Sequence, residues 1–512
     1  MNITGFGLLH YTERGYLYIA GLPYLQGSHI MSRTGRITFL QINDSHAYVS
    51  PHPELFWQGS KDRFLTCGGY ARIAHIFNTV RSEHTDSVVT LDNGDTLHGT
   101  YPVIQSQGEA MIPVLNSLCF DAMTAHWEFA YGPAHFKALS QKLTYPVLAL
   151  NCYDETSHEL IFPPYTIIER GGLCIGIIGV ANTIVDKTMP SSFSKGIYLT
   201  LGNEELPAYI QELREEQRVD LVVVLSHLGF PQEVQLASQV RGIDVLLSGH
   251  THNRMYTPII EHGTVLMQSG CHGSFVGRLD VTVEDGSITG HSHELIPVTE
   301  SIPPDPHVDA LVHEITAPHQ ELLQQVVGKT QIPLHRYGVM ETTMDNLLLE
   351  SLLHATHAEL AFSNGWRYGA PVSPGPLTVN DLWNIVPTNP PLTLCDITGE
   401  ELKIMIEENL EHTFSRNPYN QMGGYVKRCM GLHIYFKIEN PEGHRVLEIF
   451  INGKRMGPRH TYRCCFLTAQ GVPEKYGENR QVLSVHAVDA LSEYISSTGT
   501  VAPHLRGTIV PI

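Results

Sequence analysis

Seven short apolar runs recur in the first half of the chain and predict buried strands. They are RITFLQIN (36–43), SVVTLDN (87–93), YPVLALN (145–151), CIGIIGVA (174–181), DLVVVLSH (220–227), IDVLLSGH (243–250) and TVLMQSG (264–270). Between several of them lie amphipathic stretches such as EELPAYIQELREEQ (204–217), with apolar residues at helical spacing. Near-continuous apolar strands separated by helices are typical of a sheet that is covered on both faces. We therefore predict an α/β fold for this half.

The pattern changes after residue 298. SIPPDPH (301–307) is a proline-rich break, and VDALVHEITAPHQELLQQVV (308–327) predicts a linking helix. PLTVNDLWNIVPTNPPLTLCDITGEELKIMIEENLEH (376–412) mixes strand and helix patterns and predicts a second domain of the α+β class. The predicted organisation is a leader of unclear structure (1–35), an α/β domain (36–300), a linker with a helix (301–329) and an α+β domain (330–512).

The composition is that of a globular protein, with 42% hydrophobic and 17% charged residues, and 512 residues are enough for two or three domains. A formal net charge of −19 argues against a nucleic-acid polymer or an anionic membrane as the main partner. A local basic pocket for a small anionic substrate is compatible with that charge.

The nine cysteines show no CxxC spacing, and the pair Cys464–Cys465 is predicted to lie inside a strand. Free thiols indicate a reducing compartment. The chain has no apolar run of about 18 residues, the length that a membrane helix needs. Its first thirty residues lack the pattern of a signal peptide, and Met31 is a candidate for the true start. We therefore predict a cytoplasmic protein.

Polar residues able to bind a metal follow four of the predicted strands. They are Asp44 and His46, then Asp95 behind the turn residue Gly94, then His227, and finally His250 and His252. The carboxyl ends of parallel strands meet at one edge of a sheet, so we expect these side chains to converge. Mixed carboxylate and imidazole donors suit Mn²⁺, Fe²⁺ or Zn²⁺ better than Mg²⁺ or Ca²⁺. The donors exceed what one ion needs, which predicts two ions bridged by a carboxylate.

These motifs also resemble a known family. DSH (44–46), NGD (93–95), the segment around His126, SHLG (226–229) and GHTH (249–252) occur in the order seen in calcineurin-like metallophosphoesterases. The whole chain is similar to the two-domain 5′-nucleotidase family within that superfamily, through ETTMDNLLLESL (341–352), SNGWRYG (363–369) and PGPLTVNDLWNIVPTNPPLTLCDITGEEL (374–402). The resemblance implies an N-terminal calcineurin-like α/β sandwich and a C-terminal α+β domain that binds substrate.

The resemblance also implies roles for the metal-binding residues. Asp44, His46 and His252 would hold one ion, while His227 and His250 would hold the other. Asp95 would bridge the two ions. Mn²⁺ is the first expectation, with Zn²⁺ and Fe²⁺ as alternatives. A metal-bound hydroxide would then be the nucleophile, and no protein nucleophile would be required.

One stretch, MTAHWEFAYGP (123–133), departs from the family pattern. The family has Asn-His-Glu where this chain has His126, Trp127 and Glu128, so His126 takes the place of an asparagine ligand. Trp127 stands at the catalytic histidine, and Ala130 stands at the aspartate that orients it. We predict that His126 is a seventh metal ligand. The alternative is that Trp127 fills an apolar pocket and His126 is a buried spectator.

The same stretch resembles a particular branch of the family, the SoxB-type thiosulfohydrolases of bacterial sulfur oxidation, which carry His-Trp-Glu-Phe. The similarity extends through GDTLHG (94–99), YGPAHFKAL (131–139) and NPYNQMGGYVKRCMGL (417–432). Members of this branch cleave a sulfur–sulfur bond and release sulfate from a cysteine on a carrier protein. They are typically exported.

The second domain supplies candidate residues for binding a tetrahedral oxyanion. Arg367 of SNGWRYG and Arg428 of GGYVKRCMGL are predicted to bind the phosphate or sulfate group, because a guanidinium offers a planar pair of donors. FLTAQGVPEKYGENRQV (466–482) lacks the family's pattern for holding a base. Tyr476 in this segment either stacks on a base or is exposed to solvent.

Three functions follow from these motifs. The first is a dinuclear metal-dependent hydrolase of a nucleotide or another small phosphomonoester. The second is a thiosulfohydrolase that would need a carrier protein as its partner. The third is a non-catalytic protein that binds metal or anions. We rank phosphoester hydrolysis first.

Overall fold

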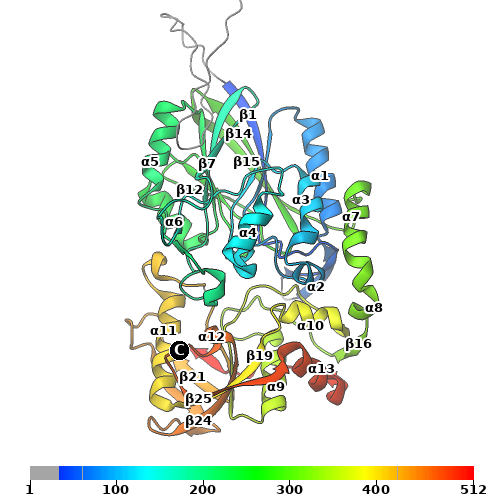
Figure 1. Cartoon of the computed structure of the whole chain (residues 1–512), viewed down its shortest axis with the longest axis vertical. Coiled ribbons are helices and arrows are strands. Elements are labelled where there is room, and N and C mark those ends of the chain that lie inside the picture. The colour runs from blue at the N-terminus through cyan, green and yellow to red at the C-terminus, as the bar shows by residue number, and fades with distance from the viewer. Residues whose placement is uncertain (1–33, 60, 424) are drawn as a thin grey trace, which may run out of the picture.

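The computed structural model describes residues 34–59, 61–423 and 425–512. The chain forms two lobes stacked along its longest axis, with the N-terminal lobe running from blue to green and the C-terminal lobe from yellow to red (Figure 1). The predictions for the leader up to residue 33, including the start at Met31, lie outside the described residues. None of the helices in the described ranges is both long and apolar enough to span a lipid bilayer.

Two sheets form the centre of the N-terminal lobe. The first has the order β15–β14–β1–β4–β5 and the second the order β12–β13–β11–β10–β8–β7. The bounds in the first sheet are β1 (Thr34–Ile42), β4 (Val88–Asp92), β5 (Ala122–Met123), β14 (Phe275–Glu284) and β15 (Ser287–Pro297). Those in the second are β7 (Tyr165–Arg170), β8 (Leu173–Val180), β10 (Leu221–Ser226), β11 (Val245–Leu247), β12 (Ile259–Glu261) and β13 (Thr264–Met267). Six of the seven predicted strands are thereby confirmed.

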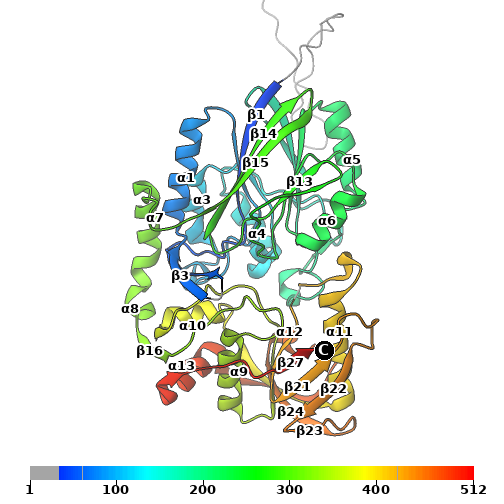
Figure 2. The ribbon, with the colours of Figure 1, turned by 180° about the vertical axis from the view of Figure 1, so that it is seen from behind.

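The two sheets pack face to face, and helices cover their outer faces. Phe39 and Leu91 from the first sheet share one apolar cluster with Ile177 and Val223 from the second. The helix α1 (Tyr70–Glu83) packs outside the first sheet, while α5 (Leu206–Gln211) and α6 (Phe230–Gln239) lie outside the second (Figures 1 and 2). The predicted α/β sandwich is confirmed.

The run YPVLALN is the predicted strand that does not form. Only an isolated parallel bridge joins Val147 to Met123. Pro146 has no N–H to donate, and the next donors go to three different neighbours, since Leu148, Ala149 and Leu150 bond to Met123, Pro163 and Gly179 in turn. The segment is buried between elements, and this explains its strand-like apolar character.

The linking helix is shorter than predicted. It breaks into α7 (Pro306–Thr316) and α8 (Gln320–Leu323), and the strand β16 (Val326–Thr330) begins before the predicted end. Pro318 explains the break, because proline removes a backbone donor and clashes with the preceding helical turn. Figure 2 shows α7 beside α1 in the upper lobe and α8 close to the lower lobe.

The C-terminal lobe is a mixed α+β domain, as predicted. Its main sheet has the order β20–β17–β24–β19–β25 and contains both parallel and antiparallel pairs. The bounds are β17 (Leu360–Ser363), β19 (Pro391–Thr398), β20 (Arg428–Met430), β24 (Thr461–Leu467) and β25 (Glu478–His486). The helices are α9 (Thr343–Thr356), α10 (Val379–Ile385), α11 (Gly399–Phe414) and α13 (Ala487–Thr498). Cys464 and Cys465 lie buried in β24, which confirms their prediction.

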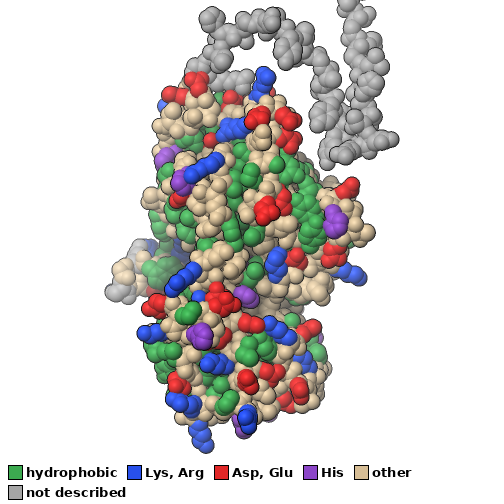
Figure 3. All heavy atoms as spheres, turned by 90° about the vertical axis from the view of Figure 1, so that its left-hand side faces the viewer, with side chains coloured by type: hydrophobic (Ala, Val, Ile, Leu, Met, Phe, Trp, Pro, Cys, Tyr) green, Lys and Arg blue, Asp and Glu red, His purple; other side chains and the backbone are tan. Residues whose placement is uncertain are grey.

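Charge is dispersed over the face that Figure 3 shows. Lysine and arginine side chains lie scattered among aspartates and glutamates there, and no broad basic area gathers on this face. The arrangement agrees with the acidic net charge.

Candidate metal centre

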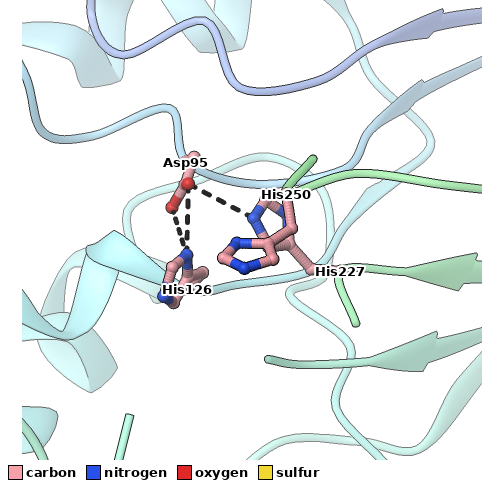
Figure 4. A group of neighbouring side chains, drawn as sticks. All are labelled: Asp95, His126, His227 and His250. Atoms are coloured by element: carbon pink, nitrogen blue, oxygen red, sulfur yellow. Dashed lines mark hydrogen bonds and ion pairs between the residues drawn. The ribbon is translucent and has the colours of Figure 1, made fainter. Parts of the chain in front are cut away.

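The seven predicted metal-binding residues meet where the two lobes face each other. Two groups of donor atoms form, each lying within 4.8 Å of one another. The first group is Asp95, His126, His227 and His250, and the second is Asp44, His46 and His252. Figure 4 shows the first group, with Asp95 in contact with His126 and His227. The structure thus brings the predicted residues together in the predicted division, and their role as ligands stays a prediction.

Asp95 and His227 connect the two groups. A carboxylate oxygen of Asp95 lies 3.1 Å from Nδ1 of His126 and 3.3 Å from Nε2 of His227. The same Nε2 of His227 lies 3.5 Å from the carboxylate of Asp44. Asp44 in turn lies 3.2 Å from Nε2 of His252. This central position of Asp95 is compatible with a bridging ligand.

The backbone is strained at most of these positions. Left-handed φ angles occur at Asp44 (51°), His46 (46°), Asp95 (58°), His250 (69°) and His252 (57°). Residues other than glycine rarely adopt such angles, and those that do cluster at functional sites. The turns that follow the strands therefore aim these side chains toward one point.

Glycine is required in the turn before Asp95. Gly94 has φ +86°, and a Cβ there would lie 2.8 Å from the carbonyl oxygen of Thr124. The close approach of these two segments explains why the predicted tight turn contains glycine.

Two supporting residues were not foreseen from the sequence. The buried carboxylate of Glu128 accepts N–H bonds from His126 (2.7 Å) and Thr96 (2.6 Å), among others, and so ties the loop carrying His126 to the loop carrying Asp95. The carbonyl of Asn93 accepts a bond from Nδ1 of His227, which leaves Nε2 to face the carboxylates. Both residues stand inside recognisable motifs, Glu128 in HWE (126–128) and Asn93 in NGD (93–95).

Unpartnered buried atoms show that the cluster fits cations. Within the described residues, Oδ1 of Asp44 and the Nε2 atoms of His126 and His227 are buried without a hydrogen-bond partner. Nε2 of His46 also lies 3.2 Å from Nε2 of His252. Each neutral imidazole carries its single proton on one of two nitrogens, so these two atoms bond to each other only if one is protonated and the other is not. Buried polar groups are normally satisfied, and divalent ions would satisfy these.

The electrostatics of the cluster favour positive charge. Burial opposes ionisation of Asp44 and Asp95, but neighbouring histidines outweigh it and hold the pKa of both carboxyls below the ordinary value. Burial lowers the pKa of His46 to about 3, so its imidazole is neutral and able to bind metal. Burial opposes a charge on His227, yet Asp95 and Asp44 raise its pKa to about 10. A cation at His227 therefore displaces a proton.

His126→Ala is expected to weaken one of the two cation sites and leave the other nearly unchanged. His126 belongs to the group around Asp95, whereas the group around Asp44 does not include it. Calorimetric titration with Mn²⁺ should show two tight binding events in the wild type and one in the variant. His135→Ala, the same change at a half-buried histidine outside both groups, should titrate like the wild type. Identical titrations for wild type and His126→Ala would make His126 a spectator.

Trp127 forms part of the wall beside the cluster. Its ring is 7% exposed, stacks on His98 at 4.9 Å and meets the edge of Tyr368 at 5.5 Å. Its backbone N–H donates to Asp95 at 2.7 Å, so the residue also orients the central carboxylate. Ala130 has no side-chain proton donor or acceptor. The histidine–aspartate pair that the family resemblance leads one to expect is absent from these two positions.

A cavity of about 390 Å³ opens from the cluster between the lobes. Asp95 and four histidines of the cluster line one end, namely His46, His126, His250 and His252. Residues of the C-terminal lobe and of the segment 184–189 line most of the rest. Arg367 reaches across, since its Nη1 donates to Nε2 of His250 (2.9 Å) and to the carbonyl of His250 (3.1 Å). The predicted arginine therefore lies at the mouth of the candidate metal centre.

Arg428 does not reach this cavity. Its side chain is 2% exposed, pairs with Asp345 at 2.8 Å and donates to the carbonyls of Gly338 and Val339. This placement argues against the predicted contact with substrate, because every terminal nitrogen is engaged inside the lobe. Its neighbour Lys427 lines the cavity instead.

Tyr476 matches neither of its two alternatives. It is 6% exposed and belongs to the apolar core of the C-terminal lobe, so it is neither a solvent-facing residue nor part of the cavity wall.

Comparison with known families identifies both halves of the chain. Residues 37–254 match the model of the calcineurin-like phosphoesterase family, and residues 325–468 match that of the 5′-nucleotidase C-terminal domain.

Two named proteins are similar in sequence to most of this chain. A trifunctional nucleotide phosphoesterase of Bacillus subtilis is 24% identical over 81% of this chain, and the match spans 30% of that longer protein. A snake venom 5′-nucleotidase of Naja atra is 25% identical over 81% of this chain and 84% of its own length.

Solved structures share the fold. The sulfate thiohydrolase SoxB of Thermus thermophilus has a TM-score of 0.86 at 24% identity, with 96% of this chain and 98% of that chain covered. A 5′-nucleotidase precursor from the same organism has a TM-score of 0.81 at 24% identity, with 93% and 99% covered.

An α/β sandwich with carboxylates and imidazoles gathered at its strand ends defines a metallophosphoesterase domain, and a second, mixed α+β domain faces this cluster across the cavity. The chain belongs to the two-domain 5′-nucleotidase family of calcineurin-like phosphoesterases. It is accordingly a hydrolase with candidate sites for divalent metal ions.

Proposed function

We propose that the protein hydrolyses a nucleotide or another small phosphomonoester with two bound divalent cations, Mn²⁺ first among them. One observation carries the proposal: two groups of carboxylate and imidazole donors meet at the inner end of a cavity that Arg367 enters from the opposite lobe. Cations on one side and a guanidinium on the other suit a tetrahedral oxyanion. The cytoplasmic location predicted from the sequence belongs to the same proposal.

The residues of the chain have separate tasks in this reaction. Bound cations would neutralise the oxyanion and activate water for attack. Asp95 is oriented by the N–H of Trp127 and by His126, so the central carboxylate keeps its position. Arg367 binds the oxygens of the transferring group from the other side and holds it in line. Trp127 and Tyr368 form an apolar wall that limits access of bulk water.

Protonation of the leaving group is the step that the site catalyses least. A positioned general acid typically contributes about 10²–10⁴-fold, and Trp127 and Ala130 offer none where the family pattern has a histidine and an aspartate. We therefore expect phosphomonoesters with good leaving groups, such as aryl phosphates, to react faster than alkyl phosphates.

The same feature favours a second candidate, cleavage of a sulfur–sulfur bond with release of sulfate. A thiolate is a better leaving group than an alkoxide because thiols have pKa values near 8.5, so loss of a general acid matters less. The HWEF stretch at residues 126–129 supports this reading. It ranks second because the two relatives named above are a nucleotide phosphoesterase and a 5′-nucleotidase.

A substrate panel tests the proposal. Purified Mn²⁺-loaded protein should hydrolyse 4-nitrophenyl phosphate and at least one nucleoside monophosphate faster than cysteine S-sulfonate, and chelation should abolish turnover. Release of sulfate from cysteine S-sulfonate, with no release of phosphate from any ester, would replace the first candidate with the second. Activity with none of these compounds would leave the non-catalytic alternative.

A further inference from the structure

Lys427 is a buried cation in the cavity wall with little to neutralise it. Its side chain is 4% exposed, and its ammonium donates to the carbonyl of Gln470, the one acceptor it meets in the described part of the chain. An ammonium has three donors, and burial of a charge with a single neutral partner is unfavourable. Burial accordingly lowers the pKa of Lys427 to about 8.

The other lysines of the cavity are already compensated. Lys187 donates to the carboxylate of Asp186 at 2.9 Å and to two backbone carbonyls. Lys475 pairs with Glu408 at 2.7 Å. Lys427 therefore differs from both, because its charge faces the cavity without a carboxylate bonded to it.

Lys427 lies on a polar part of the wall, and its hydrogen-bond partners among the described residues include none of the metal-binding ones. The bonds of its ammonium and backbone N–H go to Gln470 and Asn409, and the amide of Gln470 accepts a bond from Asn364 at 2.8 Å. The titratable neighbours that act on the charge of Lys427 are Cys429, whose thiol burial keeps protonated by raising its pKa to about 12, and Glu408.

Arg367 has different neighbours. Asp44 and Asp95 of the metal centre act on its charge, and Nη1 is bonded to His250. Its Nε is buried and without a partner among the described residues, and so is available to an oxyanion at the metal centre. The two cations therefore face different parts of a molecule in the cavity.

We propose that Lys427 binds a second anionic group, a carboxylate or a further phosphate, on the leaving part of the substrate. The proposal rests on the proposed function, because Arg367 and the metal centre are assigned to the group that is hydrolysed. A cavity of about 390 Å³ is large enough for a small molecule with two anionic ends. The substrate class is then a phosphomonoester that carries an additional negative charge, despite the acidity of the protein as a whole.

A pair of esters with the same shape tests this assignment. We expect wild-type, Mn²⁺-loaded protein to hydrolyse 4-carboxyphenyl phosphate with a kcat/KM about tenfold or more above that for 4-carbamoylphenyl phosphate, as a charge-assisted hydrogen bond allows. Lys427→Met should reduce this ratio to about one, and Lys427→Arg should retain part of it. Lys475→Met, which removes a cavity lysine already paired with Glu408, should keep the wild-type ratio.

Binding measurements separate this inference from the proposed function. Calorimetry with the non-hydrolysable 4-carboxyphenyl and 4-carbamoylphenyl phosphonates needs no turnover. Wild-type protein should bind the carboxyphenyl compound more tightly, and Lys427→Met should bind the two compounds equally. Thermal unfolding should show that Lys427→Met is folded, since it removes a poorly compensated buried charge. Equal preference in wild type and Lys427→Met would overturn the role of Lys427. A preference that depends on Lys427 without hydrolysis of either ester would overturn the proposed function and keep the anion site.

Discussion

Asp95→Asn is expected to lower kcat/KM for phosphomonoesters by at least about 10³-fold. Loss of a single oxyanion-hole donor costs roughly 10²–10³-fold, and loss of the carboxylate predicted to bridge two ions should cost more. Asp95 contacts His126 and His227 and accepts the N–H of Trp127, so it is the central residue of the cluster. Asparagine has nearly the same shape, and its oxygen can still accept that N–H. The expected loss is therefore one of charge and metal affinity, which steady-state kinetics and metal content would both record.

Asp92 offers a matched control three residues earlier. It is buried like Asp95, and its carboxylate accepts bonds from Gly94 and Thr96, but it belongs to neither group of donor atoms. Asp92→Asn should keep metal content at the wild-type level and lose less than about tenfold in kcat/KM, the usual range for a supporting hydrogen bond. Equal losses in the two variants would mean that Asp95 acts only through the fold of its loop.

The double variant Trp127→His, Ala130→Asp is expected to raise kcat for nucleoside monophosphates by about 10²-fold, the lower end of what a general acid contributes. It restores the histidine–aspartate pair of the family pattern beside the metal centre. The gain should be only a few-fold for 4-nitrophenyl phosphate, because nitrophenolate leaves without a proton. Removing the Trp127 ring, which packs on His98, should lower the free energy of unfolding by roughly 3 kcal/mol. Activity should therefore be measured at a temperature well below the midpoint of thermal unfolding.

Trp127→Phe with Ala130→Asp controls for the change in packing. Phenylalanine keeps an aromatic ring against Tyr368 but supplies no proton, so kcat for the nucleotides should not rise. A similar rise in both double variants would assign the effect to space in the cavity instead of proton transfer. A folded histidine variant with no gain on nucleotides would show that the missing pair is not what limits phosphoester hydrolysis here.

The fold was largely predictable from local patterns. Near-continuous apolar runs were sufficient for six of the strands, since burial on both faces leaves few polar positions within them. The pattern failed at YPVLALN, where apolar residues are buried without forming a ladder, and at Pro318, where a helical pattern continues across a residue that stops the helix. Both failures concern backbone hydrogen bonds, which hydrophobicity does not report.

The sequence was sufficient to predict which side chains cluster at the strand ends, but not which residues hold them in place. Asp44, Asp95, His227 and His250 stand directly after apolar strands, and convergence of strand ends brings them together. Glu128 and Asn93 act through bonds to backbone groups of other segments, and such long-range pairings leave no local pattern.

Which basic residues face the cavity was harder to predict, for a physical reason. Arg367 and Arg428 look equivalent as sequence, but strand geometry turns Arg428 into the lobe toward Asp345 and leaves Lys427 facing the cavity. Side chains alternate along an extended segment, so neighbouring cations face opposite ways. Whether Lys427 or Arg428 faces the cavity depends on how the segment is set along the neighbouring strand, and a sequence motif does not specify that register.

Elemental analysis of Mn²⁺-saturated, gel-filtered wild-type protein tests the dinuclear centre most directly. Two groups of donors, with Asp95 as the predicted bridge between them, predict about two manganese ions per chain, with phosphatase activity rising in proportion to metal content. One ion per chain at full activity would contradict the dinuclear assignment, and metal-free protein with undiminished activity would contradict the assignment of the site.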